Sequence, residues 1–186
     1  MEENDIKIGD QTWTSKNLDL ETYRNGDVIP QVQDATEWAN LITGAWCYYE
    51  NESANGTTYG KLYNWYAVND ARGLAPKGYH IPSDEEWTKL SENLGVESGT
   101  KMKSTTGWED DGNGTNTSGF AGLPVGYRIY HGEFSNIAAN AYWWSSSEYD
   151  ISIAWMRNLS YDYGYASSYY NSKQNGLSVR CIRDWD

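Results

Sequence analysis

Residues 142–184 read YWWSSSEYDISIAWMRNLSYDYGYASSYYNSKQNGLSVRCIRD, and the two ends of this segment differ in composition from its middle. The ends predict core structure, because Trp143 and Trp144 stand near one end and apolar positions in residues 177–182 form a strand-like run near the other. The middle, residues 149–175, is mostly Tyr, Ser, Asn, Asp and Gly, a composition typical of adaptable binding loops. We therefore predict a rigid scaffold that displays a binding surface at residues 149–175.

The candidate contact residues are aromatic, hydroxyl, amide and acidic residues within 149–175. They are Tyr149, Asp150, Ser152, Tyr161, Asp162, Tyr163, Tyr165, Ser168, Tyr169, Tyr170 and Asn171. The alternative is that several of these tyrosines only cover a terminal sheet. Successive residues of a strand point to opposite faces, so we expect one of Trp143 and Trp144 to face the core and the other the opposite side. Both are expected to be scaffold, and Trp155 is expected to belong to the core.

The chain has 186 residues, which suits one domain over residues 1–186 with a core at about 5–184. Only 39% of the residues are hydrophobic, and aromatic residues supply much of that share, with 16 Tyr and 10 Trp against 2 Phe. Indole N–H and phenol O–H groups need hydrogen-bond partners when they are buried. This composition favours a loop-rich fold with many local polar contacts over a helical bundle.

The formal net charge is −12, from 14 basic and 26 acidic residues. Such a surface repels phosphate backbones and anionic membranes, so we expect no nucleic-acid partner. No apolar run approaches the roughly 20 residues that span a bilayer, so we expect no direct membrane insertion. The start, MEENDIKIGD, has no signal-peptide pattern. We expect an extracellular or cell-surface protein whose signal or anchor is not present in this chain.

Periodicity and turn signals predict a mixture of short strands, helices and loops. The clearest helix is residues 83–94, where Ser83 and Glu86 can form a capping box and Gly95 ends the helix. The other predicted helices are residues 36–42, with Trp38 and Leu41 inward, and 59–69. The predicted strands are two strands joined by a turn within 6–18, a buried strand at 45–50 and an interrupted strand at 120–130, and the predicted loops are 51–58 and 100–119.

Asp110, Asp111 and Asn113 are the candidate metal ligands, and a structural calcium ion is the only cofactor that the sequence raises. With Thr115 and Asn116 they alternate oxygen-bearing side chains with glycines, as calcium loops do. The spacing differs from that of an EF-hand, and the bidentate glutamate of that loop is missing. A glycine-rich turn held by Asx hydrogen bonds explains the same pattern, so both interpretations stay open.

Few residues have the pattern of a catalytic site. Cys47 and Cys181 are compatible with one disulfide or with two buried thiols. His80 is expected to be structural and His131 to be solvated. The carboxylates form no recognisable acid–base pair, and there is no phosphate-binding glycine loop. We therefore expect no enzymatic activity.

The landmarks of the chain, taken in order, resemble a bacterial family, the Fibrobacter succinogenes major paralogous domain. The matching stretches are GDQTWTSKNL at 9–18, AWCYYE at 45–50, YGKLYNWYAV at 59–68, GLAPKGYHIPSDEEW at 73–87, GFAGLPVGYR at 119–128, YWWSSSEY at 142–149 and KQNGLSVRCIRD at 173–184. Many members have a cysteine near position 75, where this chain has Ala75, so their disulfide framework does not transfer. The likeness covers nearly the entire chain.

The resemblance implies an α+β, C-type-lectin-like fold, similar to that of formylglycine-generating enzymes. In that fold two helices pack on small antiparallel sheets, and the N- and C-terminal strands pair, here residues 6–13 with 177–183. The Tyr-rich segment is then expected beside the terminal strand, on the face where such folds carry ligands. Formylglycine-generating enzymes use closely spaced cysteines near the C-terminus, whereas Cys181 stands alone, which disfavours that activity.

We accordingly expect a non-enzymatic, ligand-binding domain of a bacterial secreted or surface protein, with an unknown protein or glycan ligand on a cell surface. Tyr, Asn, Ser, Asp, Ile, Ala and Gly are all reachable from Asn codons by changing adenines. Diversity-generating retroelements mutate adenines, and several of their targets have C-type lectin folds, so residues 149–175 are a candidate variable segment. The alternatives are a carbohydrate-binding or adhesin module of fixed specificity, a formylglycine-generating-type enzyme and a purely structural surface module.

Overall fold

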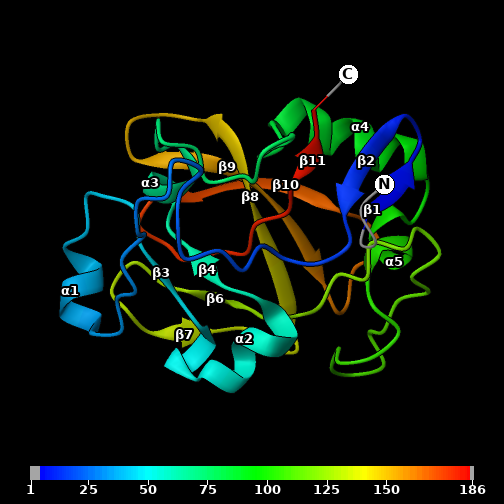
Figure 1. Ribbon diagram of the computed structural model, residues 1–186. Coiled ribbons are helices and arrows are strands. Elements are labelled where there is room, and N and C mark those ends of the chain that lie inside the picture. The colour runs from blue at the N-terminus through cyan, green and yellow to red at the C-terminus, as the bar shows by residue number, and fades with distance from the viewer. Residues whose placement is uncertain (1–4, 185–186) are drawn as a thin grey trace.

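The computed structural model describes residues 5–184 (Figure 1). Its strands form antiparallel sheets of two to four strands. The four-stranded sheet has the order β1-β2-β11-β5, from Asp5–Ile8, Gln11–Thr14, Ile182–Arg183 and Tyr79–His80. The three-stranded sheet has the order β10-β9-β8, from Ser167–Ser172, Ile153–Ser160 and Asn140–Glu148. One small sheet pairs β3 (Trp46–Cys47) with β4 (Leu62–Tyr63). The other pairs β6 (Tyr127–Arg128) with β7 (Phe134–Ser135).

The two ends of the described chain lie side by side in the four-stranded sheet, as expected, but residues 177 and 178 pair with Tyr63 and Trp143 and not with the N-terminal strands. Ile182 of β11 pairs with Trp13 of β2, and the blue and red strands are adjacent in Figure 1. The Thr14 amide donates to the Cys181 carbonyl at 3.0 Å, which extends the pairing by one residue. The predicted strand–turn–strand at the start is also confirmed, since β1 and β2 form a hairpin around Gly9.

Strand β8 runs through the middle of the molecule and places its two adjacent tryptophans in two different parts of the core. Trp143 packs with Trp13, Trp87 and Phe120, with its ring centroid 5.3 Å from that of Phe120. Trp144 packs in a separate cluster with residues such as Tyr63. Both tryptophans are fully buried, so they are scaffold on opposite sides of β8 as predicted, but the expectation that only one of them faces the core is wrong.

The buried indoles find polar partners inside the protein. Trp143 Nε1 donates to Asn17 Oδ1 at 2.8 Å, and Trp144 Nε1 donates to the Tyr63 carbonyl at 2.8 Å. Trp87 Nε1 donates to the Trp144 carbonyl at 3.3 Å, which ties a helix to β8. These contacts satisfy the polar requirement that a core rich in Trp imposes.

The longest helix is α4, Asp84–Leu94, and it packs on β8, β9 and β1. Ser83 and Glu86 form the predicted capping box, and Trp87 and Leu90 are buried on its inner face. The other helices are short: α1 Ala35–Ala39, the 3-10 helix η1 Tyr49–Asn51, α2 Ser53–Tyr59, α3 Trp65–Val68 and α5 Ser98–Met102. In α1, Trp38 is buried and Leu41, just beyond the helix, is partly buried, as expected.

The prediction of a helix over residues 59–69 is wrong for most of its length. Leu62 and Tyr63 form a strand, and only residues 65–68 are helical, because the Asn64 side chain accepts from the Ala67 amide and caps a new helix there. A buried strand followed by one helical turn places apolar residues at the same spacing as a continuous helix. Of the two helices expected near 59–69 and 83–94, only the second is therefore present at its expected length.

The predicted loop at 51–58 is also wrong, because residues 53–59 form α2. Its sequence SANGTTY has weak intrinsic helix propensity. Packing compensates for this weakness, since a Cβ at Gly56 would lie 2.1 Å from Cε1 of Tyr48. The predicted strand at 120–130 shrinks to Tyr127–Arg128, and the predicted loop at 100–119 begins inside α5.

Cys47 and Cys181 are both buried free thiols, so the disulfide that the sequence left open does not form. The predicted buried strand at 45–50 is present as β3 and contains Cys47. Within residues 5–184, no helix has the length and apolar character needed to cross a bilayer.

Candidate ligand-binding face

The candidate face lies on the three-stranded sheet, where β10 forms the outer edge. The register pairs Tyr170 with Trp155, and Ser168 with Arg157. Arg157 pairs in turn with Trp143 of β8, so these side chains share one face of the sheet. Helix α4 covers the Trp143 end of this face, and the part around Trp155 and Tyr170 extends beyond it.

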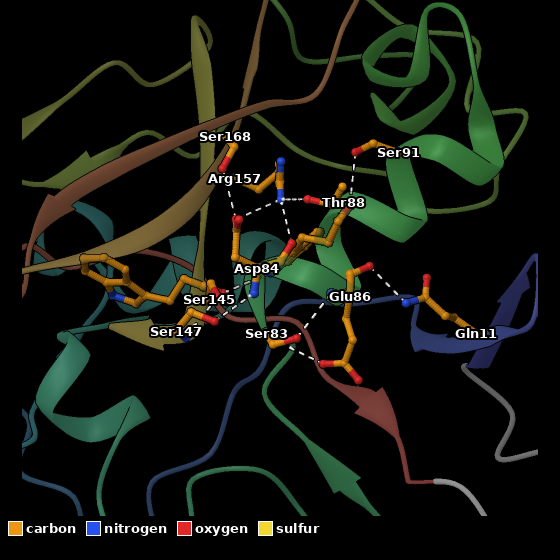
Figure 2. A network of polar contacts seen from close by, with 12 residues as sticks. Gln11, Ser83, Asp84, Glu86, Thr88, Ser91, Ser145, Ser147, Arg157 and Ser168 are labelled. Atoms are coloured by element: carbon orange, nitrogen blue, oxygen red, sulfur yellow. Dashed lines mark hydrogen bonds and ion pairs between the residues drawn. The ribbon is translucent and has the colours of Figure 1, made fainter. Parts of the chain in front are cut away.

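Asp84, the first residue of α4, marks the border between the covered and the open part. Arg157 Nη2 donates to Asp84 Oδ1 at 3.0 Å, and Ser168 Oγ donates to the same oxygen at 3.0 Å (Figure 2). Burial lowers the pKa of Arg157, and the Asp84 carboxylate opposes that shift. Because the ion pair is largely shielded from water, it fixes the start of α4 against β9 and β10.

Three aromatic side chains form a group on the open part of the face, which we call the first aromatic group: Tyr149, Trp155 and Tyr170. The ring centroids of Tyr149 and Tyr170 are 4.7 Å apart, and those of Tyr149 and Trp155 are 5.1 Å apart. Both tyrosines are about half exposed, at 51% and 53%. Ile151, in the turn between β8 and β9, is 93% exposed.

Hydrogen bonds from Asp150 and the buried Lys173 hold the turn that contains Tyr149 and Ile151. Asp150 Oδ1 accepts from the Ser152 amide at 2.7 Å and from the Ile153 amide at 2.9 Å, and these hydrogen bonds lower the pKa of Asp150. Lys173 is buried, pairs with Glu148 and donates to the Ile151 carbonyl at 3.0 Å. Asp150 and Ser152, predicted as ligand contacts, therefore also stabilise the turn.

Tyr163 and Tyr165 form the second aromatic group, in the turn between β9 and β10, with ring centroids 5.5 Å apart. A buried lysine again holds the turn, because Lys103 Nζ donates to the Ser160 carbonyl at 2.9 Å and to the Tyr161 carbonyl at 3.2 Å. Burial lowers the pKa of Lys103. Helix α5 supports the same turn, since a Cβ at Gly99 would lie 2.7 Å from the Tyr165 carbonyl carbon.

The structure does not bring all eleven predicted contact residues onto one surface. Tyr169 is exposed, but it points to the opposite face of β10 from Tyr170. Asn171 Oδ1 accepts from Asn175 Nδ2 at 2.5 Å, and Ser160 Oγ donates to Asp162 Oδ1 at 2.5 Å. Tyr161 is partly buried and packs against the cluster that contains Trp143.

The candidate calcium ligands lie together on one turn. Asp110 and Asp111 have positive φ, and the Gly112 amide donates to the Glu109 carbonyl at 2.8 Å. Asn113 Oδ1 accepts from the Trp108 amide at 3.1 Å, so this side chain already closes the loop by a hydrogen bond to the backbone. Within residues 5–184, no group of three or more His, Cys, Asp or Glu side chains is arranged to hold a metal ion. Calcium at this turn stays a prediction.

Trp155 is the main residue that sequence reasoning misplaced, since it is partly exposed in the first aromatic group and not in the core. Its position in β9 alternates with buried Ala154 and Met156, and this alternation is a signal that could have placed it on the other face. Asp84 was not predicted because it lies 73 residues before Arg157 in sequence, in a helix. The Tyr-rich segment does not adjoin the terminal strand as expected, because β8 and β9 separate β10 from residues 177–179.

These features define a class of protein: a mixed α/β domain of small antiparallel sheets that presents aromatic side chains from rigid turns at a sheet edge. The family model described as Fibrobacter succinogenes major domain matches residues 6–183, and the chain belongs to that family. The resemblance stated from the sequence motifs is thereby confirmed. Comparisons with curated proteins and with solved structures returned no match.

Proposed function

We propose that this domain binds a ligand without transforming it, through the two aromatic groups, which lie toward opposite ends of strand β9. The observation that carries the proposal is that Tyr149, Tyr163, Tyr165 and Tyr170 are each about half exposed on turns and a strand that buried side chains hold in place. Rigid tyrosines supply a large contact area at a low cost in conformational entropy. The ligand is a protein or a glycan on a cell surface.

The pairing of the N- and C-terminal strands and the packing of α4 beside them support a C-type-lectin-like fold for the domain. In this proposal the domain belongs to a bacterial secreted or cell-surface protein. The net charge of −12 is consistent with a partner that is neither nucleic acid nor an anionic membrane.

The state of the ionisable side chains supports binding over catalysis. Burial raises the pKa of Cys181 to about 12 and that of Cys47 to about 12, so neither thiol is a ready nucleophile near neutral pH. Both ring nitrogens of His80 already have carboxylate partners: Nε2 lies 2.8 Å from Glu86 Oε1, and Nδ1 lies 2.7 Å from Asp184 Oδ1. A reaction of the formylglycine-generating type needs accessible, closely spaced cysteines, which these two residues do not provide.

We also propose that residues 149–175 are a variable segment of a diversity-generating retroelement target. The exposed positions carry the residue types that adenine mutation of Asn codons produces, and most buried positions carry other types, with Ala154 and Asn175 as exceptions. In β9, for example, Met156 and Leu159 are buried, and neither belongs to that set of residue types.

A glycan-binding module of fixed specificity is the second candidate, and the first aromatic group favours it. Trp155, Tyr149 and Tyr170 form an exposed aromatic surface next to the hydroxyl of Ser168 and the carboxylate of Asp84. An aromatic face beside polar groups suits a sugar ring, which has apolar C–H faces and polar edges.

The test is a screen of the wild-type domain against a glycan array and against a displayed library of random peptides, followed by affinity measurement for each binder. We expect Tyr149→Ala and Tyr170→Ala each to weaken binding at least about tenfold, because truncating an interface tyrosine at a hot spot costs about 2 kcal/mol. Circular dichroism would confirm that both variants remain folded.

Tyr130→Ala is the matched control, because Tyr130 is 52% exposed but lies in the connection between β6 and β7, away from the candidate face. Binding that falls equally in the control, or that survives both Tyr149→Ala and Tyr170→Ala, would contradict the proposal. Peptide binders would favour the adaptable surface, whereas binders restricted to one glycan type would favour fixed specificity.

A further inference from the structure

A cavity of about 650 Å³ lies on another part of the molecule, away from the two aromatic groups. Its walls come from the segment after β2, from α2 and from the loop at 121–123, and Arg180 also lines it. Cavities of roughly 300–1,000 Å³ are typical of small-molecule sites. The cavity is therefore large enough for a small organic ligand.

Arg180 places a buried, positively charged guanidinium in the wall of this cavity. Only 2% of its surface is exposed, and its guanidinium lies over the Phe120 ring with 4.3 Å between the guanidinium carbon and the ring centroid. Nε donates to Asn17 Oδ1 at 2.8 Å, and Nη1 donates to the Thr14 carbonyl at 2.7 Å. Nη2 makes no hydrogen bond with residues 5–184, so this nitrogen is available to a ligand.

The positive charge of Arg180 is not neutralised by a carboxylate within the described part of the chain, because no ion pair forms within 4 Å of it. Burial lowers the pKa of Arg180 to about 9, which reflects the lack of compensation for its charge. Both hydrogen-bond acceptors that hold it are neutral amide oxygens. A buried charge without an opposite charge is costly, and a carboxylate is a good geometric match for a guanidinium.

The remaining charges around the cavity also favour an anion. Lys16 lines the cavity and is exposed at its rim. Asp19 is the one acidic residue of the lining, and the buried Lys61 pairs with it. The cavity is thus locally positive on a protein whose net charge is −12.

A purely structural role would explain only part of this arrangement. Arg180 does fasten the segment after β2 to the end of the chain through Thr14 and Asn17. That role uses Nε and Nη1, but it explains neither the free Nη2 nor the cavity beside it.

We propose that this cavity binds a small organic carboxylate, with the carboxylate group against Arg180 and Lys16 and the apolar part of the ligand against Ala121 and Leu123. Inorganic phosphate fits less well, because it has no apolar part to contact Ala121 and Leu123. The site is separate from the aromatic face, so this proposal is independent of the function proposed above.

The probes are benzoate, hexanoate and inorganic phosphate, and the readouts are isothermal titration calorimetry and thermal unfolding of the whole domain. We expect saturable binding of benzoate or hexanoate with a rise in Tm, because a ligand that binds only the folded state stabilises it. Phosphate at the same concentration and ionic strength is expected to bind much more weakly. No saturable carboxylate binding, or equal binding of phosphate, would overturn the proposal.

Two rim substitutions test the location without disturbing the core. Lys16→Glu should weaken carboxylate binding about tenfold at low salt, because it reverses a charge a few ångströms from the ligand. Thr58→Trp should abolish binding by filling the cavity from its exposed wall. Lys7→Glu, the same charge change on β1 and outside the cavity lining, is the matched control and should leave affinity unchanged.

Arg180→Met tests the anchor itself, provided that circular dichroism shows a folded domain, and it should remove carboxylate binding. If Arg180→Met does not fold, the result rests on Lys16→Glu and Thr58→Trp. Full affinity in both rim variants, or an equal loss in Lys7→Glu, would show that the carboxylate binds elsewhere and would refute the assignment of this site.

Discussion

At the scale of single residues, this acidic protein buries several of its basic side chains, and these side chains hold loops in place. The buried cations are Lys61, Lys103, Arg128, Arg157, Lys173 and Arg180. Arg128, for example, is fully buried and donates to the carbonyls of Val32, Gln33 and Gly132 at 2.6, 2.7 and 3.0 Å. Several such cations bind backbone carbonyls of irregular segments, which satisfies polar groups that no sheet or helix satisfies.

His80 gives a residue-scale prediction about pH. Its hydrogen bond to Glu86, with a further contribution from Asp184, raises the pKa of His80 above the ordinary value of 6.5. The stabilisation is therefore fully present below pH 6.5 and is lost as pH rises through the raised pKa. We expect His80→Gln to lower Tm most at about pH 5.5 and least at about pH 9, measured by thermal unfolding across that range.

His131→Gln is the control for this experiment, because His131 is exposed and its contact with Glu133 is long, at 3.8 Å. The control should leave the pH profile unchanged. A difference between wild type and His80→Gln that stays constant or grows with pH would disprove the role given to this histidine.

At the scale of elements, α4 matters because it supports the core and borders the candidate face at the same time. Its capping box is made by Ser83 Oγ, which accepts from the Glu86 amide at 3.2 Å, and by Glu86 Oε2, which accepts from the Ser83 amide at 2.8 Å. Ser83→Ala removes one of these hydrogen bonds and should lower the free energy of unfolding by about 1 kcal/mol. Urea denaturation measures this change.

Ser91→Ala in the same helix is the matched control. Ser91 Oγ only donates back to the Trp87 carbonyl at 3.1 Å, and alanine has the higher helix propensity. The control is expected to be neutral or slightly stabilising. Equal destabilisation by the two substitutions would mean that the capping box contributes nothing specific.

At the scale of the whole molecule, exposure predicts where the sequence is free to vary. If residues 149–175 are diversified, substitutions among natural isolates should concentrate at exposed positions such as Tyr163 and Tyr170, because about half of each of these side chains is open to solvent. Buried positions in the same segment, such as Met156 and Lys173, should stay unchanged because their loss disturbs packing or the turn anchors. Sequencing the gene from many isolates measures this pattern.

The exposed tyrosine of another surface serves as the comparison, since Tyr130 lies outside the segment and is as exposed as Tyr170. Variation that is even across residues 149–175, or as frequent at Tyr130, would count against diversification and leave a module of fixed specificity as the better explanation.

Local signals in the sequence predicted the parts of the fold that depend on neighbouring residues. The capping box of α4, the hairpin of β1 and β2 and the opposite orientation of Trp143 and Trp144 all follow from residues within one or two turns of each other. The prediction of one helix over 59–69 was wrong because Asn64 caps a new helix that begins at Trp65. Local periodicity does not show such a cap.

The sequence by itself determined the family, the pairing of the chain ends, the scaffold tryptophans and the existence of a Tyr-rich segment. Only the tertiary structure decided which of those tyrosines share a face, that Trp155 joins them, and that the distant Asp84 borders them. It alone also revealed the cavity beside Arg180. The physical reason is that strand register and packing between segments far apart in sequence set these positions, and composition and periodicity report only on near neighbours.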